Sequence, residues 1–405
     1  MKICMISKYP PIEGGVSSKT YWTAKALGER GHEVHIVTNA LEVEEEYREG
    51  IDINDPNYTP KNVHVHNTDP SPTIKANPSH IPFSKMYCEK LASLAIEVIE
   101  ENDIQVIDSW YLIPYCVSGY LAKSFTETPQ IIRHAGSDLQ RLYPSPYLKK
   151  LLKKVVRSAD GIITNQSNVN FFTDLGVSPS RIHHTQPLYV DTTTFNPNVA
   201  PFNLEPYITN QKYYPRIPII AYIGKITHHF ETKGLPELLK ACSNIKEDFL
   251  LLFVANGNEL AEFKGLVENA CLTRKACFLP FLAPWQIPLL MKTCTCIVSL
   301  ENRFSPMLDY HVPTIPAEAM ATGRCVLMSK ELHGKEPYRK LKENKEVLIV
   351  DVENVNEIKG IVEKLIKDPD NANIVGSNAC HAISRFAQIE KHVNQTVRIY
   401  KSLMH

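Results

Sequence analysis

Short apolar runs alternate with longer segments of helical periodicity from one end of the chain to the other. The first run, at residues 2–7, leads through a Gly-Gly turn into a helical segment that ends near Arg30. A second apolar run follows at residues 33–38, and either Ser17 or Ser18 is suitably placed to cap the intervening helix. This order predicts a βαβ unit with parallel strands.

The alternation continues along the rest of the chain and is interrupted by one long linker. Residues 191–216 are rich in Asn, Pro, Tyr and Thr and lack periodicity, which is typical of a linker between domains. We therefore predict an α/β protein with Rossmann-like domains at residues 1–200 and 201–385, and a C-terminal helix at 386–405 that packs back toward the first domain. The further strands are expected at residues 63–66, 104–107, 130–133, 161–164, 181–186, 217–223, 249–254, 276–279, 296–300, 325–328 and 347–350.

Charge and cysteine content narrow the class of protein. The 44 basic and 44 acidic residues cancel, so no net field would attract nucleic acid. No apolar run has the length of a signal-peptide core or of a membrane span, which favours a cytoplasmic protein. Ten cysteines without a C-x-x-C pair favour reduced, buried thiols.

Histidines lie close together at three places, but no cysteine or carboxylate cluster accompanies them in the sequence. A metal site needs three or four converging ligands, so the sequence predicts no metal site. The histidines concerned are His64 and His66, His183 and His184, and His228 and His229.

The turn after the first strand is a candidate phosphate site. Gly14 and Gly15 allow close approach of the backbone, and the helix that follows offers free N–H groups. The G-x-G-x-x-G spacing is absent, and a plain tight turn explains the two glycines equally well.

Several short motifs, in order, resemble glycosyltransferase family 4, the retaining transferases of the GT-B fold. The opening is similar, with its Gly-Gly turn and a helix that ends in GERGHEVHIVT, and residues 133–138 (RHAGSD) resemble the H-x-x-D turn of that family. Residues 190–197 resemble its linker motif, and residues 222–225 with the pair Lys233-Gly234 resemble the diphosphate-binding segment. The resemblance implies the GT-B fold, with two Rossmann-like domains whose parallel sheets face a central cleft.

The resemblance places the diphosphate of a donor against Gly224, Lys225 and Lys233. Two ammonium groups in one cleft would stabilise the negative charge that develops on the leaving diphosphate, and they would replace a metal ion. Lys225 stands where the family usually has Arg. From spacing alone, solvated loop lysines are an equal alternative.

A second donor segment resembles the E-A-M-A-x-G helix of the family. The matching Glu318 would accept hydrogen bonds from the ribose hydroxyl groups, and Thr314 or Pro316 would open a helix directed at phosphate. An exposed helical glutamate is the alternative. The first acidic residue of the family's E-x7-E motif falls on Tyr310, so Glu301, Asp309 or neither replaces it.

Polar residues follow two of the predicted strands. Glu301, Asn302 and Arg303 form a cluster at the carboxyl end of a strand, where α/β folds bind ligands, and we expect them to contact the donor. The resemblance implies that His134 contacts the sugar near the reacting carbon, and a structural histidine is the alternative.

The remaining candidates belong to the acceptor side. Trp110 and Tyr111 would stack on an acceptor, although aromatic core packing explains them equally well. Ser137 and Asp138, in the H-x-x-D turn, are assigned to the same side. Retaining transfer of this kind uses the leaving phosphate as the base, so it requires neither paired carboxylates nor a cofactor.

These motifs predict a metal-independent retaining glycosyltransferase that uses a nucleoside diphosphate sugar, in the first instance a UDP-sugar. The acceptor is open among glycan, lipid, natural product and protein. The alternatives are a nucleotide-sugar epimerase or hydrolase on the same fold, or a binding protein that has lost catalysis. The basic helix at residues 149–157 offers peripheral membrane contact, but a charged surface helix is favoured there.

Overall fold

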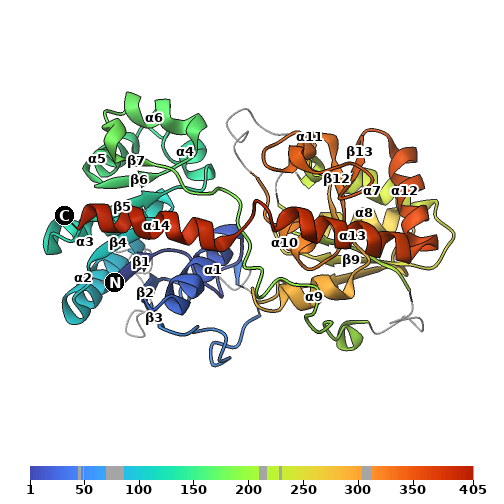
Figure 1. The fold of residues 1–405 in the computed structure, drawn as a ribbon, viewed down its shortest axis with the longest axis horizontal. Helices are drawn as coiled ribbons and strands as arrows, with labels where there is room; N and C mark the ends of the chain where they lie inside the picture. Colours follow the sequence, from blue (N-terminus) through green and yellow to red (C-terminus); the bar gives the residue numbers. More distant parts are fainter. Residues whose placement is uncertain are drawn as a thin grey trace, which may run out of the picture. The chain divides into compact units, whose positions relative to one another are not determined.

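The computed structural model describes residues 1–43, 47–48, 50–69, 86–208, 217–227, 230–302 and 312–404. These form two compact units, drawn in Figure 1. The first contains residues 1–187 and 389–405, and the second contains residues 188–388. The second unit begins before the predicted boundary at residue 200 because the linker packs on it: Phe195 is buried, and Phe202 N donates to Leu289 O at 3.0 Å.

The first unit is built on a sheet in the order β3-β2-β1-β4-β5-β6-β7, and its strands pair in parallel. The strands are β1 (Lys2–Ile6), β2 (Glu33–Thr38), β3 (Val63–Asn67), β4 (Val106–Trp110), β5 (Gln130–Arg133), β6 (Gly161–Ile163) and β7 (Ile182–His183). The helices are α1 (Gly15–Glu29), α2 (Tyr87–Asn102), α3 (Val117–Thr126), α4 (Ser137–Arg141), α5 (Lys149–Ser158), α6 (Val169–Asp174) and α14 (Ile389–Leu403), with a π-helical turn η4 at Leu112–Cys116.

Helix α1 begins earlier than the sequence predicted. Its N-cap is Gly14, with φ of 108°, and neither Ser17 nor Ser18 caps it. Glycine adopts this backbone conformation without the steric cost that a side chain would bring. Ser17 therefore lies in the first turn of the helix, where it is fully buried.

Helix α2 packs its apolar stripe against one face of this sheet. Leu91, Ala95 and Val98 recur at helical spacing and are buried against the strand residues Cys4 and Ile6. Helix α5 likewise buries an apolar face and leaves its lysines exposed. Each helix thus turns one stripe to the sheet and the other to solvent.

The last helix, α14, belongs to the first unit although it ends the chain. It lies beside α1 (Figure 1), and Gln395 Oε1 accepts a hydrogen bond of 2.8 Å from Gln186 N. Its Thr396 Oγ1 accepts from Arg133 Nη2 at 3.2 Å, and the Tyr400 hydroxyl donates to Asp108. The two strand residues therefore hold the helix through buried polar groups.

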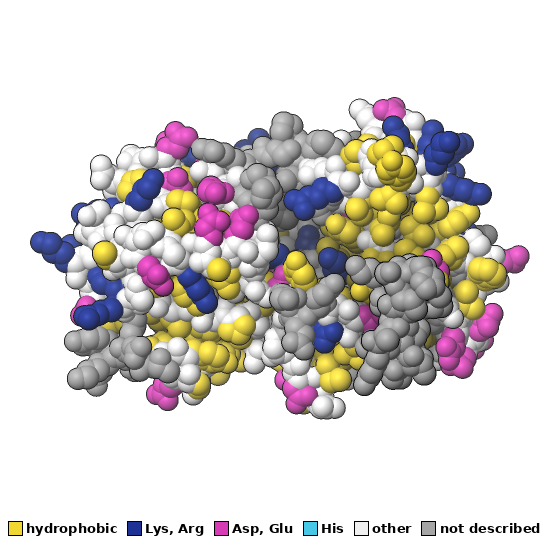
Figure 2. Space-filling view, turned by 180° about the vertical axis from the view of Figure 1, so that it is seen from behind, with side chains coloured by type: hydrophobic (Ala, Val, Ile, Leu, Met, Phe, Trp, Pro, Cys, Tyr) yellow, Lys and Arg dark blue, Asp and Glu magenta, His cyan; other side chains and the backbone are white. Residues whose placement is uncertain are grey.

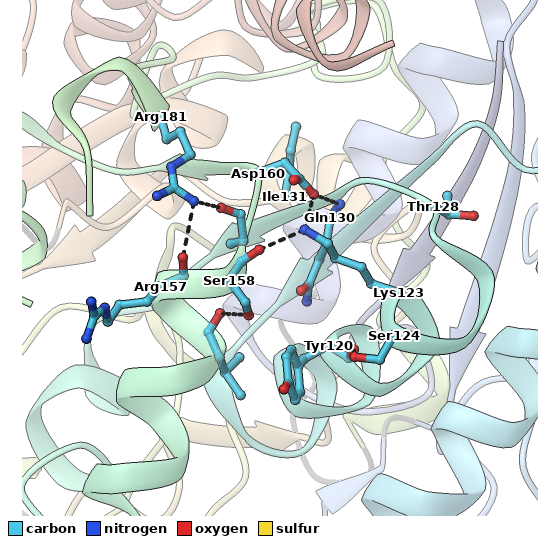
Figure 3. A network of polar contacts seen from close by, with 12 residues as sticks. Tyr120, Lys123, Ser124, Thr128, Gln130, Ile131, Arg157, Ser158, Asp160 and Arg181 are labelled. Atoms are coloured by element: carbon cyan, nitrogen blue, oxygen red, sulfur yellow. Dashed lines mark hydrogen bonds and ion pairs between the residues drawn. The ribbon is translucent and has the colours of Figure 1, made fainter. Parts of the chain in front are cut away.

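A second polar network ties the outer strands of the first sheet together (Figure 3). Lys123 Nζ donates to Asp160 Oδ2 at 2.6 Å and to Ser158 O at 2.7 Å. The same carboxylate oxygen accepts from Gln130 N at 2.8 Å, and Arg181 donates to two backbone carbonyl groups at the end of α5. Charged side chains here satisfy backbone groups at strand ends.

The second unit has a parallel sheet in the order β10-β9-β8-β11-β12-β13. Its strands are β8 (Ile219–Ile223), β9 (Leu250–Val254), β10 (Ala276–Leu279), β11 (Cys296–Ser299), β12 (Cys325–Ser329) and β13 (Leu348–Val350). Its helices are α7 (Leu235–Ser243), α8 (Leu260–Asn269), α9 (Ile287–Thr293), α10 (Ile315–Ala321), α11 (Lys330–His333), α12 (Val355–Lys367) and α13 (Pro369–Ile383), with a 3-10 turn η8 at Phe230–Lys233. Each sheet has its own core.

The surface mixes charges of both signs. Figure 2 shows basic and acidic side chains on the same face without one continuous field of either sign, in keeping with the equal numbers in the sequence. Within the described ranges, no helix is both long enough and apolar enough to cross a membrane.

Candidate functional site

The candidate donor site lies at the carboxyl edge of the second sheet. Strands β8 and β11 are neighbours and run parallel, so the residues after both strands meet at one edge. Gly224 N donates to Val254 O at 3.1 Å, and the Tyr222 hydroxyl donates to Lys225 O at 3.2 Å. A Cβ on Gly224 would lie 2.8 Å from that hydroxyl oxygen, so a side chain here would have to displace the tip of Tyr222.

Lys233 ends η8 beside the polar cluster that follows β11. Its Nζ lies 3.6 Å from Glu301 Oε1, with a third of the lysine side chain exposed. Asn302 N donates to Thr232 O at 3.1 Å, which holds the two loops together. Among the residues that the structure describes, Asn302 Oδ1 is buried without a hydrogen-bond partner. The structure thus brings together Lys233, Glu301 and Asn302 of the predicted site.

Glu301 is a buried carboxylate with a fixed orientation. Ser299 Oγ donates to its Oε2 at 2.7 Å, and the Ser329 hydroxyl donates to its backbone carbonyl. Burial raises the pKa of Tyr222, and the nearby charge of Glu301 raises it further. A buried carboxylate that accepts a hydrogen bond from a hydroxyl group and is paired with an ammonium group is a preorganised anchor for that ammonium.

Helix α10 carries the second predicted donor residue. Thr314 is its N-cap and Pro316 lies in its first turn, so the helix opens at the residues that the sequence offered as alternatives, and its direction toward phosphate stays a prediction. Glu318 is 6% exposed, and Thr322 Oγ1 donates to its backbone carbonyl at 2.6 Å. The exposed helical glutamate considered from the sequence is therefore wrong for this residue.

Tyr338 is a fully buried residue that packs next to α10 and was missed in the sequence. Its hydroxyl donates to Pro313 O at 2.5 Å, just before α10. Burial raises its pKa well above the usual value, and the charges of Glu318 and Glu301 raise it further. No motif marks a tyrosine that lies this far along the chain from either glutamate.

Arg303 and Asp309 lie outside the described residues, as does Tyr310. That Glu301, Asp309 or neither replaces the first acidic residue of the motif stays a prediction; of the two, the structure describes Glu301, whose carboxylate lies beside Lys233.

We expect Gly234→Ala to disturb this site and to lower stability by about 1–3 kcal/mol. Gly234 has φ of 65°, and a Cβ would lie 2.6 Å from Leu300 O, next to Glu301. Chemical denaturation and nucleotide titration would measure the two effects. Gly265→Ala in α8 is the matched control, because no atom lies within 4 Å of its added Cβ. Equal stability and affinity of the two variants would contradict the proposed packing.

In the first unit, the Gly-Gly turn leads directly into α1. A Cβ on Gly15 would meet nothing within 4 Å, so the space beside this residue is open. Ser17 Oγ, in the first turn, is buried and finds no hydrogen-bond partner among the described residues. The turn therefore has a buried hydroxyl group without a hydrogen-bond partner among the described residues, and the space beside Gly15 is open.

The turn at residues 134–138 is organised by Asp138. Its Oδ1 accepts from the amides of Ala135, Gly136 and Leu139 at 2.9–3.1 Å, and its Oδ2 accepts from Leu112 N at 3.0 Å. The carboxylate is fully buried, so its oxygens serve the backbone of the turn. Ser137 begins α4.

His134 lies on the same turn, and contacts with Thr164 and Phe172 hold its ring. Its Nε2 lies 2.7 Å from Thr164 Oγ1, and the ring packs 5.5 Å from that of Phe172. Burial lowers the pKa of His134, and the charge of Asp138 opposes part of this shift. The ring is therefore neutral at neutral pH.

The two aromatic candidates differ in their surroundings. Trp110 is buried under the Arg133 guanidinium, whose Cζ lies 4.7 Å from the ring. Tyr111 is half-buried, has φ of 79°, and carries Lys8 Nζ 5.0 Å over its ring. Tyr111 is thus the more accessible of the two.

The structure contradicts the expectation that the histidines of residues 64–66 lack a carboxylate neighbour. Glu33, on the adjacent part of the sheet, lies within ion-pair distance of both His35 and His64. The sequence pattern missed this cluster because sheet pairing, and not sequence proximity, brings Glu33 there.

Family models match both units of the chain. The model for glycosyl transferases group 1 matches residues 210–381, and the model for glycosyltransferase family 4 matches residues 13–187. Among curated proteins, the chain is similar to N-acetyl-alpha-D-glucosaminyl L-malate synthase of Bacillus anthracis, at 23% identity over 412 residues. That match covers 98% of this chain and 96% of the relative.

Solved structures resemble the chain over nearly its whole length. HepE of Anabaena, in complex with UDP and glucose, has a TM-score of 0.67 at 16% identity and covers 99% of this chain and 100% of its own. Sucrose-phosphate synthase from Thermosynechococcus elongatus has a TM-score of 0.65 at 16% identity and covers 99% and 98%. At these identities the likeness shows a common fold.

Proposed function

Because this chain belongs to glycosyltransferase family 4 and has the GT-B fold, we propose that it transfers a sugar from a nucleoside diphosphate donor with retention of configuration. The second unit would bind the donor without a metal ion, and the first would bind the acceptor. A glycosyltransferase of this kind needs a cation where the diphosphate leaves and a carboxylate for the ribose.

The main support for this proposal is the pair of Lys233 and Glu301. The Lys233 ammonium lies at the carboxyl edge of the second sheet, and its Nζ is 3.6 Å from Oε1 of the buried Glu301. A diphosphate bound there would contact the Lys233 ammonium, which the buried Glu301 already orients. Little reorganisation of the site is therefore needed as negative charge develops on the diphosphate. Lys225, after the neighbouring strand β8, would supply the second positive charge.

Glu318 is proposed to bind the ribose. A carboxylate accepts two hydrogen bonds from adjacent hydroxyl groups, and a buried carboxylate binds them more strongly than a solvated one does. Glu318 is almost fully buried at the start of α10, close to Tyr338. Its carboxylate is therefore shielded from competing water.

The chemical step would use the donor's own phosphate as the base. The bond between the anomeric carbon and the diphosphate oxygen breaks, and the acceptor oxygen bonds to the same face of the sugar. The acceptor proton passes to the departing phosphate oxygen, so no side chain has to ionise. His134, neutral at neutral pH, would donate or accept a hydrogen bond at the sugar without adding charge.

The relatives suggest which donors to test first. HepE was solved with UDP and glucose, and the Bacillus enzyme is named for an N-acetylglucosaminyl malate product. We therefore propose a UDP-sugar donor and would begin with UDP-glucose and UDP-N-acetylglucosamine, with L-malate among the acceptors. Calorimetry in the presence of a chelator tests binding without metal, and NMR of the product's anomeric centre tests retention.

We expect Glu318→Ala to weaken nucleotide binding about 10–100-fold, because two hydrogen bonds to a buried charge are lost. Calorimetric titration with UDP, GDP, ADP and TDP measures the effect. Glu262→Ala, on the exposed face of α8, is the matched control and should bind as the parent does. Unchanged affinity in Glu318→Ala would remove the ribose assignment, and no binding by any nucleotide to the parent would remove the proposed function.

A further inference from the structure

A group of polar side chains lies on the first sheet, at its edge strand β3. Glu33 and His35 belong to β2, and His64 and His66 belong to β3. The parallel register places His35 opposite His64, and Val37 opposite His66. Because alternate residues of a strand point to the same face, all four side chains lie on one side of the sheet.

Three of these side chains present ligand atoms to one point. Glu33 Oε1 lies 3.2 Å from His35 Nε2 and 3.9 Å from His64 Nε2. One such atom from each residue lies within 4.8 Å of the others. Tetrahedral zinc bonds of about 2.0–2.1 Å place ligand atoms roughly 3.3 Å apart, so small side-chain movements complete the geometry.

We propose that Glu33, His35 and His64 bind a divalent transition metal ion of the zinc class. Two imidazole nitrogens and one carboxylate oxygen leave the fourth position to water. Magnesium prefers an all-oxygen octahedral shell, so this ligand set selects against it.

His66 orients the central ligand. Its Nε2 lies 3.1 Å from His35 Nδ1, and the two rings stack 5.3 Å apart at an interplanar angle of 10°. When His35 Nε2 binds the metal, its Nδ1–H donates to His66 Nε2, which fixes the tautomer and the ring plane. Metal-binding histidines commonly depend on such a partner for orientation.

The group is open to solvent on one side. The His64 side chain is 52% exposed and that of Glu33 is 39% exposed, whereas that of His35 is 4% exposed. An ion can thus enter from solvent and reach a buried ligand. Bound there, it would join β2 to the edge strand β3 and stabilise that pairing, independently of the proposed sugar transfer.

Calorimetric titration of the metal-free full chain with Zn2+ tests this site. We expect one Zn2+ to bind per chain and to raise the Tm, because the ion binds only the folded state. His64→Ala and Glu33→Gln should abolish this binding. His66→Ala should weaken it about 10–100-fold through loss of orientation.

His381→Ala is the matched control, since it removes an exposed histidine from α13 in the second unit. Circular dichroism of each metal-free variant checks that it folds. Because the His64 side chain is 52% exposed, we expect His64→Ala to fold as the parent does. The visible absorption of bound Co2+ should appear in the parent and in His381→Ala, and be absent in His64→Ala. Failure of the parent to bind Zn2+, equal binding of Mg2+, or full binding by His64→Ala would overturn the proposal.

Discussion

Lys233→Ala should lower kcat by about 10²–10³-fold while the protein remains folded. In the proposed reaction the diphosphate gains negative charge as its bond to the sugar breaks, and Lys233, paired with Glu301 at that edge of the sheet, would stabilise it. The nucleotide would still bind through Glu318, so affinity should fall less than turnover. Steady-state kinetics with the preferred donor, with Kd from calorimetry, separates the two effects.

Two further variants test the assignment of Lys233. Lys233→Arg keeps the charge but changes its shape, and partial recovery of kcat would assign the effect to charge. Lys240→Ala removes an exposed lysine from α7 in the same unit and should leave kcat unchanged. Loss of nucleotide affinity in Lys233→Ala with an unaltered kcat would mean that the lysine only binds the ground state.

The strands were largely predictable because their apolar runs are bounded by turn residues. Strands β2, β5 and β10 have the predicted limits. Strand β4 was predicted at residues 104–107 but spans Val106–Trp110. The difference arises because Asp108 and Ser109 are polar and yet fully buried, each with hydrogen-bond partners on β5. A polar residue that is satisfied inside the sheet leaves no signal in a hydrophobic pattern.

The sequence predicted individual residues of the candidate donor site but not how they lie relative to one another. The motifs indicated Lys233 and Glu301 individually, but their proximity depends on β8 and β11 being neighbours in the sheet. Tyr338 had no motif to mark it. The Glu33 cluster similarly required the register of β2 against β3, because a one-residue shift would turn His64 to the opposite face.

Arg133→Met should destabilise the first unit by about 3–5 kcal/mol, because it leaves a buried carboxylate without its cation. Arg133 Nε lies 3.1 and 2.9 Å from the two oxygens of Asp108, and both residues are buried. The same guanidinium donates to Thr396 of α14, and the Tyr400 hydroxyl donates to Asp108. Denaturation followed by circular dichroism measures the loss, and amide exchange over residues 389–403 shows whether α14 loosens first.

The double variant Asp108→Leu/Arg133→Met tests whether the ion pair itself adds stability or whether each buried charge is costly only when the other is removed. Removing both charges should recover much of the stability, since neither is then left buried alone. Glu29→Ala is the control: it removes the exposed partner of Lys25 on α1, an i,i+4 contact worth about 0.3–0.5 kcal/mol. If Arg133→Met cost no more than this control, the pair would contribute nothing to docking, and the apolar face of α14 would hold the helix alone. A large cost with early exchange in α14 would show that two strand residues determine where the end of the chain packs.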